Sequence, residues 1–256
     1  MWAYRVRRAA GTAAMAFSFA FVFAVVALAQ DGVQIKPTAQ AAGQEIGQNA
    51  ARDARQGRSH GEPGQFDFYV LALSWSPSYC ASVRERSPGL VPKQQCGARP
   101  FSFVVHGLWP QYERGYPSYC QRPAPRIGRG LVDSMLDLMP SPRLVFHEWD
   151  RHGTCTGLSA KQYFEAVRKA RAAIKVPPAY LDLDKPVVVA PGEVAAAFRK
   201  ANPGLRQTAM AVDCDRKRLT EIRICLNKDF SFRDCANVVR RACRLDKVAM
   251  PATRGG

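Results

Sequence analysis

The spacing of apolar residues predicts three strands. Residues 101–105, Phe-Ser-Phe-Val-Val, are aromatic and β-branched with partial alternation. The strand that they form is expected to end at His106, because a glycine and a proline follow within four residues. Residues 186–190 and 218–224 are also apolar and β-branched, as strands are.

Signals for helices lie between these strands. Ser159-Ala160-Lys161-Gln162 has the form of a capping box and opens a predicted helix that runs to about Ile174. Residues 193–201 form another predicted helix, which Asn202-Pro203-Gly204 stops. The mixed order of helices and strands favours an α+β domain.

A further helix is predicted from Ser141, a favoured N-cap residue, to Gly153, a residue type that commonly follows a helix. Phe146 and Trp149 share one side of this helix and are expected to pack into a core. At about 100° per residue, four polar side chains fall on the other side, within about 140° of one another: His147, Glu148, Arg151 and His152.

The histidines suggest the chemistry. Two short segments hold three of the four histidines, His106 in the first and His147 and His152 in the second. Imidazole titrates near neutral pH without perturbation, so histidines gathered beside Glu148 and Arg151 predict acid–base catalysis. The remaining histidine, His60, lies in a stretch rich in Gly, Gln and Arg and is assigned no role.

A zinc site is the alternative for the same helix, because the helix contains the pair His147-Glu148. The metalloprotease pattern needs a second histidine four residues after the first, but Arg151 occupies that position. A guanidinium there would repel a cation. We therefore expect no metal, and no other cofactor motif is present.

The segments HGLWP at 106–110 and HEWDRHGTC at 147–155 resemble the two active-site segments of the ribonuclease T2 family of secreted endoribonucleases. The resemblance covers about residues 65 to 245 and implies one disulfide-stapled domain, with a central antiparallel sheet packed by several helices. Three more segments carry it: 66–80, like the family's first strand, 116–120, and 219–225, like its C-terminal strand.

The resemblance also implies a reaction. The family cleaves single-stranded RNA without a metal, through a 2′,3′-cyclic phosphate, and DNA lacks the 2′-hydroxyl that this reaction needs. His152 is then the general base, His106 the general acid and His147 a phosphate ligand. Glu148 and Arg151 are expected to stabilise the transition state.

Two aromatic residues and three departures from the family pattern bear on substrate recognition. Trp109 is expected to line the site and stack on a base, and Tyr116 is a weaker candidate for a base contact. Arg151 stands where many members have Lys, Gln111 where many have Asp, and Ser74 where plant members often have Gln. Base preference is therefore not predicted.

Eight cysteines, all C-terminal to residue 65, indicate an oxidising compartment. Spacing alone leaves about 105 possible pairings. The family pattern implies these four: Cys120 with Cys155, Cys214 with Cys243, Cys225 with Cys235, and Cys80 with Cys96.

The N-terminal region resembles an export signal. Arginines at 5, 7 and 8 precede an apolar run over 9–28, and Ala27-Leu28-Ala29 fits a cleavage site after Ala29. An uncleaved membrane anchor is the alternative, because the apolar run is long. We expect a disordered linker over 30–64, a catalytic domain over 65–250 and a short tail over 251–256, in a secreted or periplasmic monomer.

The formal net charge of +16 favours a polyanionic partner such as RNA. A cationic secreted protein that only binds membranes, polysaccharides or a partner is the competing class. The full set of three histidines, Glu148 and Arg151 argues against it, because a binding protein has no need of proton-transfer residues.

Overall fold

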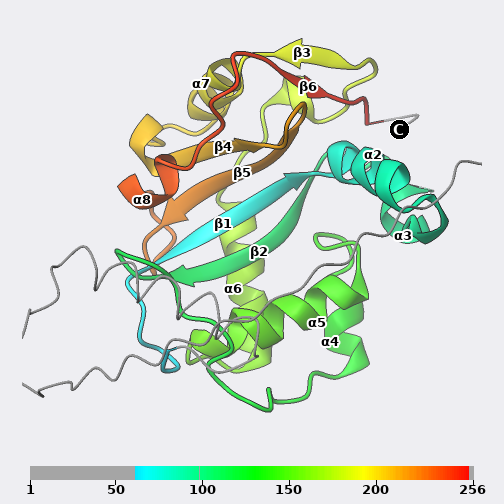
Figure 1. Ribbon diagram of the computed structural model, residues 1–256. Helices are drawn as coiled ribbons and strands as arrows, with labels where there is room; N and C mark the ends of the chain where they lie inside the picture. Colours follow the sequence, from blue (N-terminus) through cyan, green and yellow to red (C-terminus); the bar gives the residue numbers. More distant parts are fainter. Residues whose placement is uncertain (1–60, 98, 254–256) are drawn as a thin grey trace, which may run out of the picture. The chain divides into compact units, whose positions relative to one another are not determined.

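Figure 1 shows the computed structural model of the chain, which describes residues 61–97 and 99–253. The predicted signal peptide and most of the predicted linker lie outside the described residues. Residues 61–64 were assigned to the linker, but they are part of the fold, since the backbone N–H of Gly64 donates to the carbonyl of Cys155 at 2.9 Å. Among the described residues, no helix is both long and apolar enough to cross a membrane.

The fold is α+β, as predicted, and its centre is an antiparallel sheet of four strands in the order β2-β1-β5-β4. A second sheet pairs two short strands, β3 and β6. The strands are β1 (Phe68–Trp75), β2 (Phe103–Gln111), β3 (Val187–Val189), β4 (Met210–Cys214), β5 (Leu219–Leu226) and β6 (Val248–Met250).

The predicted helix caps are confirmed. The side chain of Ser141 accepts the backbone N–H of Leu144 at 3.3 Å, and Ser159 and Gln162 form a capping box. The helices are α2 (Ser76–Arg86), α3 (Lys93–Cys96), α4 (Arg129–Asp133), α5 (Pro142–Arg151), α6 (Ala160–Ala172), α7 (Pro191–Ala201) and α8 (Ala236–Val239). Short 3₁₀ turns are η1 (Pro88–Leu90), η2 (Gly153–Cys155), η3 (Pro178–Tyr180) and η4 (Gln207–Ala209).

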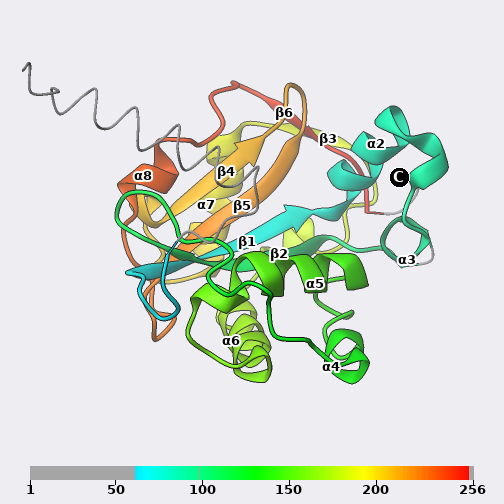
Figure 2. The same cartoon turned by 60° about the horizontal axis from the view of Figure 1, so that its bottom comes forward.

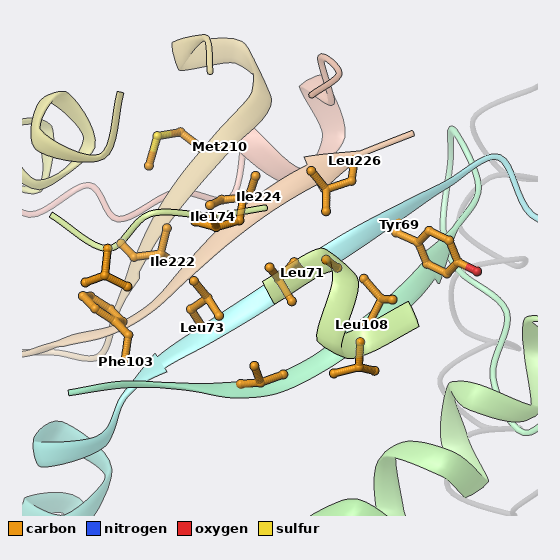
Figure 3. Close-up of a cluster of buried hydrophobic side chains, with 14 of the residues drawn as sticks. Tyr69, Leu71, Leu73, Phe103, Leu108, Ile174, Met210, Ile222, Ile224 and Leu226 are labelled. Carbon is orange, nitrogen blue, oxygen red and sulfur yellow. The ribbon is translucent and has the colours of Figure 1, made fainter. Parts of the chain in front are cut away.

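One face of the main sheet forms the hydrophobic core. Alternate residues of β1 and β5, such as Leu71, Leu73 and Ile222, are fully buried there, and Phe103 and Leu108 of β2 are buried beside them (Figure 3). Side chains of α6 and α7 pack against them. The opposite face of the sheet carries the polar residues of the next subsection.

The strand β2 departs from the prediction, because it continues through Gly107 and Pro110 to Gln111. Its pairing with β1 steps from Ala72–Gly107 to Leu73–Val105, so His106 is the extra residue of a β-bulge. Proline is tolerated here because β2 is an edge strand, with no partner beyond it in the sheet.

The helix α5 lies alongside β2 (Figure 2), and this position overturns the prediction for Phe146. Trp149 is buried as expected, but Phe146 is 49% exposed. The prediction placed the polar, functional face of the helix opposite its buried face. Instead, the buried stripe comprises Val145, Glu148, Trp149 and His152, since the polar site lies between the helix and the sheet.

All four disulfides implied by the family pattern are present: Cys80–Cys96, Cys120–Cys155, Cys214–Cys243 and Cys225–Cys235. The described residues contain no free cysteine. Cys120–Cys155 ties η2, the turn that follows α5, to the loop after β2.

Candidate active site

A cavity of about 330 Å³ opens beside the polar face of the sheet, between β2, α5, β5 and the loop after β2. The seven residues predicted for catalysis and substrate contact all line it: His106, Trp109, Tyr116, His147, Glu148, Arg151 and His152. Two sequence segments that are far apart in the chain therefore meet around one space.

The bulge in β2 places His106 and Trp109 on the same face. Residues three apart in a regular strand point to opposite faces, and the single extra residue cancels that difference. The imidazole of His106 accordingly meets the indole of Trp109 edge to face, with ring centroids 5.2 Å apart. A side chain at Gly107 would overlap the carboxylate of Glu148, so the position needs glycine.

The imidazole of His106 is held by a carboxylate from β5. Its Nδ1 lies 2.7 Å from Oε2 of Glu221, and its Nε2 lies 3.8 Å from Oε1 of Glu148. Burial alone would lower the pKa of His106, but the hydrogen bond and negative charge of Glu221, together with the charge of Glu148, raise it above the usual value. Protonated His106 is thus favoured.

Glu221 belongs to a larger polar chain on the same face. It is 5% exposed and accepts hydrogen bonds from Ser74 Oγ at 3.2 Å and Arg223 Nε at 2.8 Å. Arg223 also pairs with Asp213 at 2.8 Å. Burial works to raise the pKa of Glu221, yet His106 and Arg223 hold it below its ordinary range, so the carboxylate stays charged.

His106 and Glu221 come from strands that are not neighbours, since β1 lies between β2 and β5. On this face β1 presents Ala72, opposite Gly107 and Arg223, and then Ser74, opposite Glu221. These two small side chains leave room for the imidazole and the carboxylate to meet above the central strand. Ser74, predicted only as a departure from the plant pattern, also donates to the carboxylate.

The sequence prediction did not include Glu221 and Arg223. The segment 219–225 was predicted as a strand, and its alternation of Glu221, Ile222, Arg223 and Ile224 contains a usable signal. Side chains two residues apart share a face of a strand, so an acid and a base there indicate a charged face opposite the apolar one.

Glu148 lies deeper in the cavity wall than its neighbours on α5. Only 1% of it is exposed, and Oε2 accepts the indole N–H of Trp109 at 2.8 Å. Burial is the main reason that the pKa of Glu148 is raised to about 7. Near neutral pH, this side chain is therefore divided between a proton donor and a carboxylate.

His152 occupies a different environment at the C-terminal end of α5. It is 7% exposed, and its ring centroid lies 5.5 Å from that of Trp109 and 6.5 Å from that of Tyr116. Its Nδ1 is buried and has no hydrogen-bond partner among the described residues. Burial, and then the positive charge of Arg151, hold the pKa of His152 well below its usual value, so the neutral ring is favoured.

Arg151 and His147 complete the same wall. The guanidinium of Arg151 donates to the hydroxyl of Tyr116 at 3.5 Å and lies 5.7 Å from the ring of Tyr119, while its buried Nε has no partner among the described residues. His147 lies at the surface, and partial desolvation of its ring, then the positive charges of Arg151 and His106, lower its pKa. These groups leave donors available to an anion in the cavity.

The backbone holds the end of α5 in place. Tyr119 donates its N–H to the carbonyl of Arg151 at 2.8 Å, and Cys155 is bonded to Cys120.

Gln111, which departs from the family pattern, also lines the cavity, although its side-chain nitrogen donates to the carbonyl of Pro110 at 2.9 Å. Within the described ranges, no group of three or more His, Cys, Asp or Glu side chains could hold a metal ion.

Comparison with known proteins defines the class to which this fold and site belong. The ribonuclease T2 family model matches residues 66–235. A ribonuclease of Aeromonas hydrophila is 38% identical over 181 residues, which cover 67% of this chain and 77% of that protein. A probable ribonuclease of Haemophilus influenzae is 33% identical over 178 residues, which cover 66% of this chain and 61% of that protein.

The fold is similar to solved structures as well. An RNase-related protein from Calystegia sepium matches with a TM-score of 0.59 and 19% identity, over 76% of this chain and 100% of that chain. The chain therefore belongs to the ribonuclease T2 family, and it is an RNA-cleaving enzyme.

Proposed function

We propose that the protein is a metal-independent endoribonuclease that cleaves single-stranded RNA by transphosphorylation through a 2′,3′-cyclic phosphate. One observation carries the proposal. His106 and His152 line one cavity, but their surroundings push their proton affinities in opposite directions. Such a pair supplies one acid and one base at the same pH.

In the proposed first step, neutral His152 removes the proton of the 2′-hydroxyl. The freed oxygen attacks the adjacent phosphorus, and the bond from phosphorus to the 5′-oxygen breaks. Protonated His106 gives its proton to that leaving oxygen. The products are a 2′,3′-cyclic phosphate on one fragment and a 5′-hydroxyl on the other, with the two histidines left in exchanged protonation states.

In a second step, water opens the cyclic phosphate with the roles reversed. His106, now neutral, takes a proton from water, and His152, now charged, returns a proton to the 2′-oxygen. This step restores the starting protonation states. The Glu221 carboxylate, which the sequence prediction did not include, orients His106 in both steps through the bond at 2.7 Å.

The remaining residues act on the phosphate and the base. Arg151 and His147 offer donors to the phosphoryl oxygens, whose negative charge grows in the transition state. Glu148 contributes as a donor in its protonated form, which the pKa of about 7 keeps populated. Trp109 presents its ring to a base while Glu148 holds its N–H, and Tyr116 is a second base contact.

The test uses DNA oligonucleotides that contain one ribonucleotide. In excess chelator, cleavage is expected only on the 3′ side of that ribonucleotide, and mass spectrometry should find a cyclic phosphate there. A matched oligonucleotide with a 2′-O-methyl group at the same position is the control and should stay intact. Cleavage of the control, or activity that disappears in chelator and returns with added metal, would contradict the proposal.

Export is part of the proposal. The basic and apolar leader with its site after Ala29, and the four disulfides, are what a protein of an oxidising compartment needs. N-terminal sequencing of the protein from a cell envelope or culture medium tests it, and a first residue of Gln30 is the expected result.

A further inference from the structure

A second hollow adjoins the catalytic cavity. It is a groove of about 830 Å³ that shares His106 and Arg223 with the cavity and continues away from it along α2 and the turn between β4 and β5. We call it the α2 groove. Figures 1 and 2 both show α2 and this turn at the same end of the sheet.

The two walls of the α2 groove are joined by ion pairs. Glu85 of α2 binds Lys217 at 2.9 Å and also binds the buried Arg218, both on the β4–β5 turn. Asp215 lies 3.6 Å from Arg218 on the same turn. The disulfide Cys80–Cys96 further fixes α2 to α3. The groove is thus a built feature of the fold, since salt bridges and a disulfide hold both its sides.

The lining of the groove has the character of a nucleic-acid surface. It contains five Lys or Arg side chains and three Asp or Glu side chains, and all three acids are already paired with Lys or Arg side chains of the chain. Arg86 and Arg216 are exposed and form no ion pair within the described part of the chain. Tyr79, which is 41% exposed, adds an aromatic ring. Cations with an interleaved aromatic ring bind single-stranded nucleic acid.

The position of His106 indicates which side of the cleaved bond faces the groove. This step rests on the proposed function. The general acid protonates the 5′-oxygen of the nucleotide that leaves, so the RNA strand on the 3′ side of the cut passes His106. The α2 groove is the hollow that continues beyond His106. We propose that it binds the RNA that follows the leaving nucleotide, with Arg86 and Arg216 on its phosphates and Tyr79 stacked on a base.

The experiment compares substrates that contain one ribonucleotide in otherwise 2′-O-methylated RNA, so that each has one cleavable bond. The shortest is a dinucleotide, and the others carry three extra nucleotides on the 3′ side or on the 5′ side. For the wild-type protein at low salt, we expect the 3′ extension to raise kcat/KM by about tenfold or more, and the 5′ extension to raise it less.

The decisive variant is Arg86→Ala with Arg216→Ala. It should reduce the gain from the 3′ extension to about twofold and leave dinucleotide cleavage within about twofold of wild type. Because about 0.7 counterions are released per phosphate contact on single strands, the salt dependence with the 3′-extended substrate should flatten by roughly 1.4 in log–log slope. Tyr79→Ala should also reduce the gain, and Tyr79→Phe should keep it.

A matched control is Arg199→Ala with Lys200→Ala, which removes two exposed cations from α7 and should keep the full gain. An undiminished gain in the Arg86/Arg216 variant would overturn the proposal, as would equal losses for 5′ and 3′ extensions. Failure of the wild-type protein to cleave any of these substrates would instead contradict the proposed function, so the two failures are distinguishable.

Discussion

The cavity is lined by two histidines whose surroundings differ. His106 lies on a strand and shares a hydrogen bond with the charged Glu221, which Arg223 anchors. His152 lies at the end of a helix, with Arg151 beside it in sequence and no partner for its Nδ1 among the described residues. In the proposed mechanism, the surroundings of each ring, rather than the residue type, therefore divide the acid role from the base role.

Two physical effects act in opposite directions on the pKa of His152. The C-terminal end of a helix favours a cation by about 0.3–1 kcal/mol, which would raise the pKa of His152. The pKa is nevertheless well below the usual value, because burial and the charge of Arg151 act the other way. We therefore expect burial and the charge of Arg151 to outweigh the helix dipole at this position.

The largest expected effect comes from removing either proton carrier. His106→Ala and His152→Ala should each lower kcat by ~10²–10⁴-fold, because each removes one proton-transfer group. His60→Ala is the control and should keep the wild-type rate. The measurement is kcat on a dinucleotide substrate, and near-full activity in either cavity variant would refute the assignment of that histidine.

The cation beside His152 is next in size. Arg151→Ala should lower kcat by about 10²-fold, because a donor to the developing phosphate charge is lost. Arg151→Lys should stay within about tenfold of wild type, since the charge remains while the planar fork is lost. Equal rates for the two variants would mean that another group supplies the charge.

We expect Glu148→Gln to gain stability and to lose activity. Its pKa is about 7 in the fold against 4.5 for an ordinary glutamate, so the folded state retains a proton that the unfolded state releases. The free energy of unfolding should therefore fall as pH rises from about 4.5 to about 7, by up to about 3 kcal/mol. Glu148→Gln has no such ionisation.

Urea unfolding at pH 4 and pH 8 measures this effect. We expect Glu148→Gln to be more stable than wild type at pH 8, and the difference to shrink at pH 4. The control is Glu165→Gln on the exposed side of α6, which should change neither value by more than about 0.5 kcal/mol. A variant less stable than wild type at pH 8 would show that the buried carboxylate is not a cost to the fold.

The smallest expected effect concerns the support of His106. Glu221→Gln removes the charge that raises the pKa of His106, so that histidine should lose its proton at a lower pH. The alkaline limb of the pH–rate profile should move to lower pH, the acid limb should stay, and the plateau should fall by about tenfold. A uniform fall in rate with an unchanged profile would indicate a structural role alone.

Much of the fold could be predicted from local sequence patterns. Ser141 and Ser159 were identified as caps from short-range signals, and both predictions are confirmed. The family pattern supplied the four disulfide pairs, which spacing alone could not choose. The residues around the cavity were found because two short segments concentrate the histidines, and those segments meet in the fold.

The unpredicted features depend on contacts that are distant in sequence. The bulge at His106 shifts one residue against β1, and the segment itself suggested that the strand ended. The bond from His106 to Glu221 spans 115 residues and crosses the small side chains of β1. Phe146 was misplaced because the helix periodicity gives two faces but does not say which one meets the sheet.

The most direct test of the account is an NMR titration of the wild-type protein with selectively labelled histidines, using His106→Ala and His152→Ala to assign the signals. The account predicts that the pKa of His106 lies above the ordinary value of 6.5, and that the pKa of His152 lies well below it. If the two values are equal, or if His152 holds its proton to higher pH than His106, the proposed division into acid and base is contradicted.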